Sequence, residues 1–211
     1  MTQTGTSSAQ REHLDVHVRK ATQADIPEVV NTLARAFDDD PLINWMVAQD
    51  AHRQQRVHNA MDLTQRMVFR HGECYTTDGF HGAALWAPPG KWHLGAVAQL
   101  RLTPSLIKVT GWKRLGPVSA GVNAIERKHP HDDHYYLFVL GTDTIHQGKG
   151  VGSQVLRPVL ERCDREHMPA YLESSKEKNV PFYEHNGFKV TERFDVPNGG
   201  PPIWLMWREP S

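Results

Sequence analysis

The chain has 211 residues, which is enough for one domain with a substantial buried core. Hydrophobic residues make up 39% and charged residues 23%, a composition that excludes a disordered chain. No segment approaches the roughly eighteen uninterrupted apolar residues of a membrane span. The 24 basic and 24 acidic side chains cancel, so no basic field is present to attract nucleic acid.

The start of the chain and its cysteines bear on domain organisation and compartment. Residues 1–14 are polar and predict a flexible tail, and residues 15–211 predict a single domain. The polar start lacks the apolar core of a secretion signal. Cys74 and Cys163 lie far apart in sequence, which favours reduced core thiols and a cytoplasmic protein.

The first part of the chain predicts a strand, two helices and a hairpin. Thr22 and Asp25 are spaced as a capping box, and apolar residues then recur at three- and four-residue steps from Ile26 to Phe37. This helix should end before the segment 38–45, which is predicted to be a loop, because three aspartates oppose the helix dipole and Pro41 forbids continuation. The elements expected here are a strand at 16–21, a helix at 51–70 ending at Gly72, and hairpin strands at 73–77 and 81–86.

Residues 91–128 have a helical pattern interrupted by glycine and proline. Interruptions at Pro104, Gly111 and Gly116-Pro117 predict two or three short helices in place of one long helix. Such a segment is either an ordinary helical layer or the cover of a substrate pocket.

The stretch from Leu137 to Arg157 organises the rest of the chain. An apolar strand at 137–140 is followed by a turn and by Gln147–Gly152 (QGKGVG), directly before a helical pattern that Pro158 interrupts. Glycines let the backbone approach an anion, and the first turn of a helix carries unpaired N–H groups and a positive dipole end. This order of elements predicts a phosphate-binding loop. The stretch contains neither the GxxxxGK[ST] motif nor a full dinucleotide-binding motif.

The last part of the chain predicts a strand at 169–173, a short helix at 179–185 and a closing pair of strands at 188–194 and 203–207. Strands 137–140 and 169–173 should be parallel, because a whole helix connects them. The alternation of strands and helices predicts a layered mixed α/β domain.

Several segments together resemble the GNAT acetyltransferase superfamily. They are VRKATQADIPEVVNTLARAF, IHQGKGVGSQVL with its Q-x-x-G-x-G motif, PAYLESS, NVPFYEHNGF and TERFDVP, and they also resemble the puromycin N-acetyltransferase group in content and order. The resemblance covers nearly the whole chain after residue 14. It implies a mixed, mostly antiparallel sheet of six to seven strands with a splayed central parallel pair, flanked by helices.

The same resemblance implies acetyl-CoA as cosubstrate and assigns residues to it. The pantetheine arm would pair with the main chain of Leu140, Gly141 and Thr142. The pyrophosphate would be held by Gln147, Gly148, Lys149, Gly150, Val151, Gly152 and Ser153. The cofactor would also be contacted from the last short helix by Asn179 and Tyr183.

The resemblance also matches Tyr183 to the tyrosine that protonates the departing thiolate. A phenol suits this role because its ordinary pKa of about 10 exceeds that of a thiol. Glu173 is the leading candidate for the base, since it ends the strand beside 137–140, where open α/β sheets place ligands. His134 and Asp38–Asp40 are weaker alternatives. Each residue also has a non-catalytic interpretation: Tyr183 as an aromatic side chain packed in the core, and Glu173 as a solvated acid at the end of a strand.

The remaining hypotheses concern metal and acceptor. The cluster His129, His131, Asp132, Asp133 and His134 lacks paired cysteines and converging spacing, so no metal is expected. The acceptor is predicted to be a small-molecule amine, with no nucleic acid or membrane partner, and Asp38–Asp40 would favour a cationic amine. The alternatives are a protein lysine or N-terminal acetyltransferase and a non-catalytic acyl-CoA sensor. A monomer and a homodimer both fit the sequence.

Overall fold

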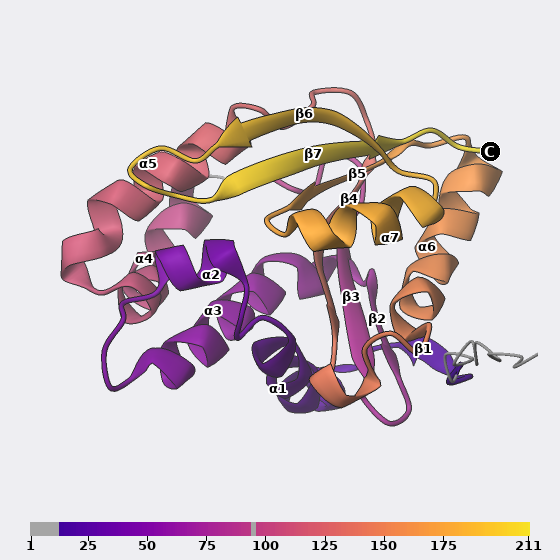
Figure 1. The fold of residues 1–211 in the computed structure, drawn as a ribbon, viewed down its shortest axis with the longest axis horizontal. Helices are drawn as coiled ribbons and strands as arrows, with labels where there is room; N and C mark the ends of the chain where they lie inside the picture. The colour runs from indigo at the N-terminus through magenta and orange to yellow at the C-terminus, as the bar shows by residue number, and fades with distance from the viewer. Residues whose placement is uncertain (1–12, 94–95) are drawn as a thin grey trace, which may run out of the picture.

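A twisted seven-stranded sheet lies at the centre of residues 13–93 and 96–211, the part of the chain that the computed structural model describes (Figure 1). The strand order is β1-β2-β3-β4-β5-β7-β6, and only β4 and β5 run parallel. The predicted fold class is therefore confirmed. The strands are β1 Val18–Lys20, β2 Cys74–Thr77, β3 Gly82–Ala87, β4 Tyr135–Thr142, β5 Ala170–Ser174, β6 Lys189–Asp195 and β7 Pro202–Arg208.

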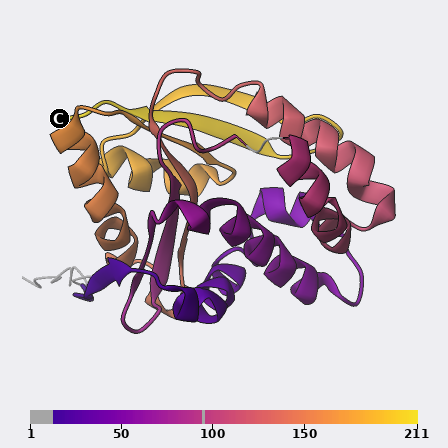
Figure 2. The ribbon, with the colours of Figure 1, turned by 180° about the vertical axis from the view of Figure 1, so that it is seen from behind.

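Helices cover both faces of this sheet. α1 and α3 pack on one face of β3 and β4, and α6 packs on the opposite face. Figures 1 and 2 show α2 to α5 gathered on one side of β3 and β4, and α6 with α7 on the other side. The helices are α1 Ile26–Ala36, α2 Pro41–Met46, α3 Arg53–Val68, α4 Ala96–Thr110, α5 Leu115–Glu126, α6 Val151–Glu166 and α7 Val180–His185.

The parallel strands β4 and β5 pair over only a short distance. Their register runs from Tyr135 opposite Ala170 to Leu137 opposite Leu172, although both strands continue beyond it. In the pairing of β3 with β4, Leu85 lies opposite Val139 and Trp86 opposite Leu137, so Phe138 is an extra residue. Such a bulge bends its strand and disrupts the ladder. β4 and β5 therefore part at Phe138, which confirms the predicted splay.

The predicted capping box and first helix agree with the structure. The Thr22 N–H donates to the Asp25 carboxylate at 2.7 Å, and Asp25 also binds the Arg19 guanidinium, at 2.7 and 2.8 Å. The apolar face of α1 is buried against the sheet. Gly72, at φ +74°, ends the turn that follows α3, as its left-handed backbone requires.

The segment 38–45 is not a loop, contrary to the prediction. Its second half forms the short helix α2, because Asp40 caps the helix by accepting the Ile43 N–H at 3.0 Å. Pro41 occupies the first helical position, where its missing N–H has no consequence. The proline therefore opens a new helix as well as ending the previous segment.

Two prolines that were expected to interrupt helices lie inside continuous ones. α4 runs through Pro104, and α6 runs through Pro158. A proline in a helix interior costs about 3 kcal/mol. The buried face of α6, which includes Val155, Leu156 and Val159, offsets that cost by packing on the sheet. Residues 91–128 thus contain two substantial helices and a short turn, Trp112–Arg114.

The end of the predicted tail contacts the rest of the domain. The Leu14 N–H donates to the Lys149 carbonyl at 2.9 Å, and the Gln154 side chain donates to the Leu14 carbonyl at 2.7 Å. Residues 1–12 of that tail lie outside the described residues. Within the described part of the chain, no helix has the length and apolar character needed to cross a membrane.

Candidate active site

A cavity of about 1300 Å³ lies where β4 and β5 part. Every residue predicted to bind acetyl-CoA or to act in catalysis lines it. These residues come from β4, the following loop, the start of α6, the end of β5 and α7. The fold therefore brings together, around one space, segments that span more than forty positions in the sequence.

The loop from Gln147 to Gly152 forms one end of this cavity, which we call the cofactor end. Gly148 and Gly150 have φ angles of +74° and +83°, a left-handed backbone that side chains disfavour. The Gln147 side chain donates to the Thr142 carbonyl at 3.1 Å and so closes the turn between β4 and α6. Gly150 is the N-cap of α6, whose first turn meets the cavity.

The end of β4 presents an open main-chain edge beside this loop. Leu140, Gly141 and Thr142 pair with β3 on one side. On the other side, β5 pairs with β4 only as far as Leu137, and residues 140–142 line the cavity. Unpaired N–H and C=O groups of such an edge are available to an extended ligand.

Basic side chains are concentrated at the cofactor end. The cavity lining there includes a lysine of the loop, an arginine of α6, histidines from three segments and two lysines that follow β5. These residues are Lys149, Arg157, His13, His146, His185, Lys176 and Lys178. A concave surface with this charge attracts anions.

Asn179 is the N-cap of α7, Tyr183 lies within that helix, and both residues line the cavity. The Tyr183 side chain is buried and packs edge-on against Phe182 and Phe188. Burial, and then the nearby charge of Asp40, raise the pKa of Tyr183 above its ordinary value. Its hydroxyl therefore stays protonated at neutral pH and is able to donate.

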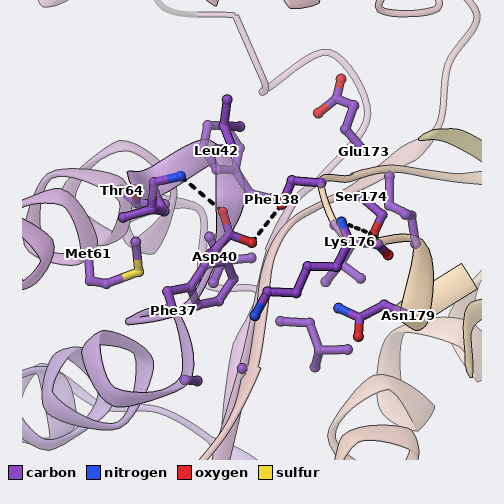
Figure 3. A pocket seen from close by; sticks show the side chains of 18 of the residues that line it. Phe37, Asp40, Leu42, Met61, Thr64, Phe138, Glu173, Ser174, Lys176 and Asn179 are labelled. Atoms are coloured by element: carbon purple, nitrogen blue, oxygen red, sulfur yellow. Dashed lines mark hydrogen bonds between the residues drawn. The ribbon is translucent and has the colours of Figure 1, made fainter. Parts of the chain in front are cut away.

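Glu173 lies near the end of β5 and lines the cavity (Figure 3). The Tyr136 hydroxyl donates to Oε2 of Glu173, and Nδ1 of His129 lies 3.4 Å from Oε1. Its side chain is only 10% exposed, so the interpretation of a solvated strand-end acid is wrong. Burial, and then the charge of Glu173, raise the pKa of Tyr136, which keeps this phenol a donor.

Apolar side chains line the other end of the cavity, which we call the acceptor end (Figure 3). They come from the end of α1, from the four helices α2 to α5 and from β4. They are Phe37, Leu42, Met46, Met61, Met67, Leu102, Leu106, Val109, Val122, Ile125 and Phe138. Residues 91–128 therefore line the pocket, which was one of their two predicted roles.

The aspartates that follow α1 do not form one acidic patch. Asp38 binds Arg53 at 2.6 Å, and Asp39 binds Lys176 and Lys178. Hydrogen bonding to Lys176 is the main cause that lowers the pKa of Asp39. Asp40 alone of the three lines the cavity. Of the three aspartates predicted to attract a cationic amine, Asp40 alone therefore presents its carboxylate to the cavity.

Asp40 is buried between the two ends of the cavity. It accepts hydrogen bonds from the Ser175 hydroxyl at 2.6 Å and from the Ile43 N–H at 3.0 Å. Burial raises the pKa of Asp40 despite these bonds. The contact with Ser175 joins the start of α2 to the segment that follows β5.

The other reactive side chains lie elsewhere. Cys74 and Cys163 are buried and outside the cavity lining, and burial raises the pKa of each thiol to about 12. Their interpretation as core thiols is confirmed. In the predicted histidine and aspartate cluster, His129 and His134 are buried, whereas residues 131–133 are exposed.

Sequence reasoning missed the neighbours of Glu173. Tyr136 was placed before the predicted strand, but β4 begins at Tyr135 and carries Tyr136 to the same face of the sheet as Tyr171 and Glu173. His129 was considered only as a metal ligand. The adjacent tyrosines Tyr135 and Tyr136, which are typical strand residues, were the signal that could have lengthened the strand.

Comparison with known proteins places these features in a family context. Residues 117–201 match the family model of the acetyltransferase (GNAT) domain. That range begins in α5 and contains the whole cofactor end, from β4 through α7. The helices α2 to α4, which line the acceptor end, lie outside it.

An uncharacterised N-acetyltransferase of Schizosaccharomyces pombe is 28% identical over 206 residues, covering 92% of this chain and 83% of the relative. The crystal structure of a histone acetyltransferase and related acetyltransferase from Corynebacterium glutamicum has a TM-score of 0.73 and 25% identity. That match covers 94% of this chain and 98% of the bacterial one. A polyamine N-acetyltransferase of Drosophila melanogaster shares the fold, with a TM-score of 0.58, 14% identity and coverage of 92% and 100%.

Proposed function

We propose that this acyltransferase, which matches the GNAT acetyltransferase domain at residues 117–201, moves an acetyl group from acetyl-CoA to the primary amine of a small molecule. The observation that carries this proposal is the continuity of the cavity. One space is lined by a basic, glycine-rich loop at one end and by buried acids and apolar side chains at the other. A donor and an acceptor can meet there in a ternary complex.

The residues at the cofactor end fit acetyl-CoA. The open edge of Leu140–Thr142 offers main-chain groups to an amide-containing arm, and the left-handed Gly148 and Gly150 expose N–H groups at the start of α6. Basic side chains around the loop suit phosphate charges. Acetyl-CoA would supply the activated acyl group, and the protein would bind and orient it.

Two side chains would move the protons of the reaction. Glu173 would take a proton from the ammonium of the acceptor, directly or through water, and so free its lone pair. Tyr183 would donate a proton to the leaving sulfur. The position of Tyr183 in the cavity lining supports this role, and its phenol is protonated before transfer. No covalent intermediate with the enzyme is needed, and both thiols lie outside the cavity lining.

The lining of the acceptor end favours a small molecule over a protein. Side chains of α2, α3, α4 and α5 line it, which gives a pocket for a compact apolar body. Asp40 and Glu173 supply negative charge where the amine would lie. We therefore expect an amine with an apolar body. Structural neighbours named as polyamine and arylalkylamine N-acetyltransferases act on small amines, which is consistent with this class.

A puromycin-type acceptor, and with it a role in antibiotic resistance, is a narrower form of the same proposal. It is supported by the segments that resemble the puromycin N-acetyltransferase group, such as NVPFYEHNGF and TERFDVP. A cytoplasmic location would agree with two buried free thiols.

Thiol release from acetyl-CoA by the purified protein tests the proposal. The panel should contain arylalkylamines, polyamines, aminoglycosides, puromycin and lysine peptides. Turnover with one small amine class, and none with peptides, is the expected result. Turnover with peptides alone would support the protein acetyltransferase alternative. Calorimetric binding of acetyl-CoA without turnover of any amine would support the sensor alternative.

A further inference from the structure

A line of polar contacts leads from Glu173 to His129, which also lines the cavity, and on to His134, which is outside the lining. Nδ1 of His129 lies 3.4 Å from Oε1 of Glu173, and Nε2 of His129 lies 3.0 Å from Nε2 of His134. Nδ1 of His134 lies 2.6 Å from the Asp132 carbonyl oxygen. His129 is 4% exposed and His134 is 1% exposed, so these imidazoles interact mainly with each other and with the protein.

The hydrogen-bond acceptors next to His134 and His129 determine which ring nitrogens of these two residues carry a hydrogen. A carbonyl oxygen only accepts, so Nδ1 of His134 carries a hydrogen. Burial lowers the pKa of His134, which favours the neutral ring with a lone pair on Nε2. Nε2 of His129 must then donate to that lone pair. In a neutral His129, Nδ1 is consequently left without a hydrogen, opposite Glu173.

Two acceptors therefore face each other at the cavity. The Glu173 oxygen and Nδ1 of His129 are separated by 3.4 Å, longer than the usual 2.7–3.2 Å of an N–H···O hydrogen bond. One added proton would turn this contact into a hydrogen bond between them. The hydrogen bonds from Glu173 through His129 and His134 to the Asp132 carbonyl therefore form a continuous chain only after Glu173 has received a proton.

We propose that His129 receives the proton that Glu173 takes from the amine, and that His134 is a positioning residue that holds His129 in the receptive tautomer. This inference rests on the assignment of Glu173 as the base in the proposed function. An ammonium loses two protons on becoming an amide. One passes to Glu173 and then to Nδ1 of His129, leaving an imidazolium paired with a carboxylate. Tyr183 gives its own proton to the leaving thiolate, which forms the thiol of coenzyme A, and the second proton of the nitrogen restores the Tyr183 hydroxyl. His129 afterwards releases its proton to water, which completes the cycle.

The surroundings of His129 support a transient positive charge there. The indole of Trp92 stacks on the ring with the centroids 3.7 Å apart. Burial raises the pKa of Tyr136 and of Tyr171, so both phenols stay neutral, and Glu173 supplies the facing negative charge. The titratable groups around His129 come from several segments: His134 from the loop before β4, Tyr136 from β4, Tyr171 and Glu173 from β5, and, beyond Trp92, His93 paired with Glu126 of α5.

His129→Asn separates proton acceptance from simple positioning. The asparagine amide lies near the place of Nδ1 and can hydrogen-bond Glu173, but it does not take up a proton. We expect kcat to fall about 10- to 100-fold with an unchanged KM for acetyl-CoA, and the acidic limb of the pH profile to shift. His131→Gln, an exposed change in the same loop, is the control and should retain wild-type kinetics. A His129→Asn enzyme with wild-type kcat and pH profile would overturn the inference.

Nitrogen NMR of ¹⁵N-histidine-labelled protein tests the tautomer directly. In the wild type at alkaline pH, Nε2 of His129 should carry the hydrogen and Nδ1 should not. His134→Gln should give a mixture of tautomers and a kcat lower by about 3- to 10-fold, at the weak end of acid–base effects. A hydrogen on Nδ1 of neutral wild-type His129 would overturn the inference. This readout needs no turnover, so failure of every amine would count against the proposed function alone.

Discussion

The two ends of the cavity differ in whether main-chain or side-chain groups line them. The cofactor end consists largely of main chain, namely the edge of β4 and a glycine loop at the start of α6, within one continuous stretch of sequence. The acceptor end consists of side chains from helices α2 to α5 and from α1 and β4. The first end suits a ligand common to a large superfamily, whereas the second can vary without disturbing it. The family match to residues 117–201 follows this division.

The largest expected effect lies between the two ends, at Tyr183. Tyr183→Phe removes the hydroxyl and keeps the packed ring, so kcat should fall about 100-fold while acetyl-CoA binding is retained. Steady-state kinetics and calorimetry measure the two quantities. Tyr135→Phe is a matched control, since Tyr135 is also a buried tyrosine but lies outside the cavity lining. Unchanged turnover in Tyr183→Phe would exclude the phenol as the acid.

A change at the cofactor end should affect only the donor. Gly150→Ala places a side chain at φ +83°, and its Cβ would lie 2.7 Å from Nε2 of His13. The left-handed backbone costs an alanine about 1–2 kcal/mol, and a loop that moves out of its binding geometry to relieve this strain should bind acetyl-CoA with a Kd about tenfold higher. The acceptor KM should not change. Gly116→Ala, where the added Cβ has open space, is the control. Equal affinities in both variants would contradict a role for the loop backbone.

A change at Asp40, between the two ends, should affect the amine more than the binding of acetyl-CoA, and the charge of Asp40 also raises the pKa of Tyr183. Asp40→Asn keeps the cap of α2 and removes a buried charge, so KM for a cationic amine should rise about three- to tenfold at neutral pH. Because burial raises the pKa of Asp40, lowering the pH should neutralise the wild-type carboxyl and narrow the difference. Asp38→Asn alters a paired aspartate outside the lining and is the control. If Asp40→Asn altered the Kd for acetyl-CoA and left the KM for the amine unchanged, Asp40 would not contribute to the binding of the acceptor.

The smallest effect on activity is expected far from both ends. Arg208 of β7 makes two hydrogen bonds to Asp164 of α6, at 2.8 and 2.9 Å, and this pairing lowers the pKa of Asp164 to about 2. Asp164→Asn should lower the free energy of unfolding by about 1 kcal/mol near neutral pH. Since the native pKa is depressed, that stabilisation is complete above about pH 4 and is lost as the pH falls towards 2. Urea denaturation across pH measures it, and kcat and both KM values should stay at wild-type levels.

Sequence patterns predicted the cofactor end closely. The spacing of Gln147, Gly150 and Gly152 after an apolar strand encodes backbone geometry, and backbone geometry depends mainly on neighbouring residues. The residues that the family resemblance assigned to acetyl-CoA all line the cavity. The predicted roles of Tyr183 and Glu173 remain predictions, and both residues line the cavity.

Local patterns were less reliable where packing competes with them. Pro104 and Pro158 should have broken helices, yet both helices continue, because α4 packs on α3 and α6 packs on the sheet. Asp40 looked like part of an acidic loop, yet it caps α2 and accepts a hydrogen bond from Ser175, which is 135 positions away. The periodicity of apolar residues along the sequence does not predict a contact between residues so far apart.

The sequence by itself determined most of the strands and helices, the glycine loop and the helix that follows it, because secondary structure and positive φ angles depend mainly on short patterns of apolar residues and glycine. Only the tertiary structure decided which side chains surround Glu173 and which helices line the acceptor end. His129, Tyr136 and Glu173 meet because β4 parts from β5 and brings a loop against a strand end. Contacts of this kind depend on long-range packing, which local sequence does not encode.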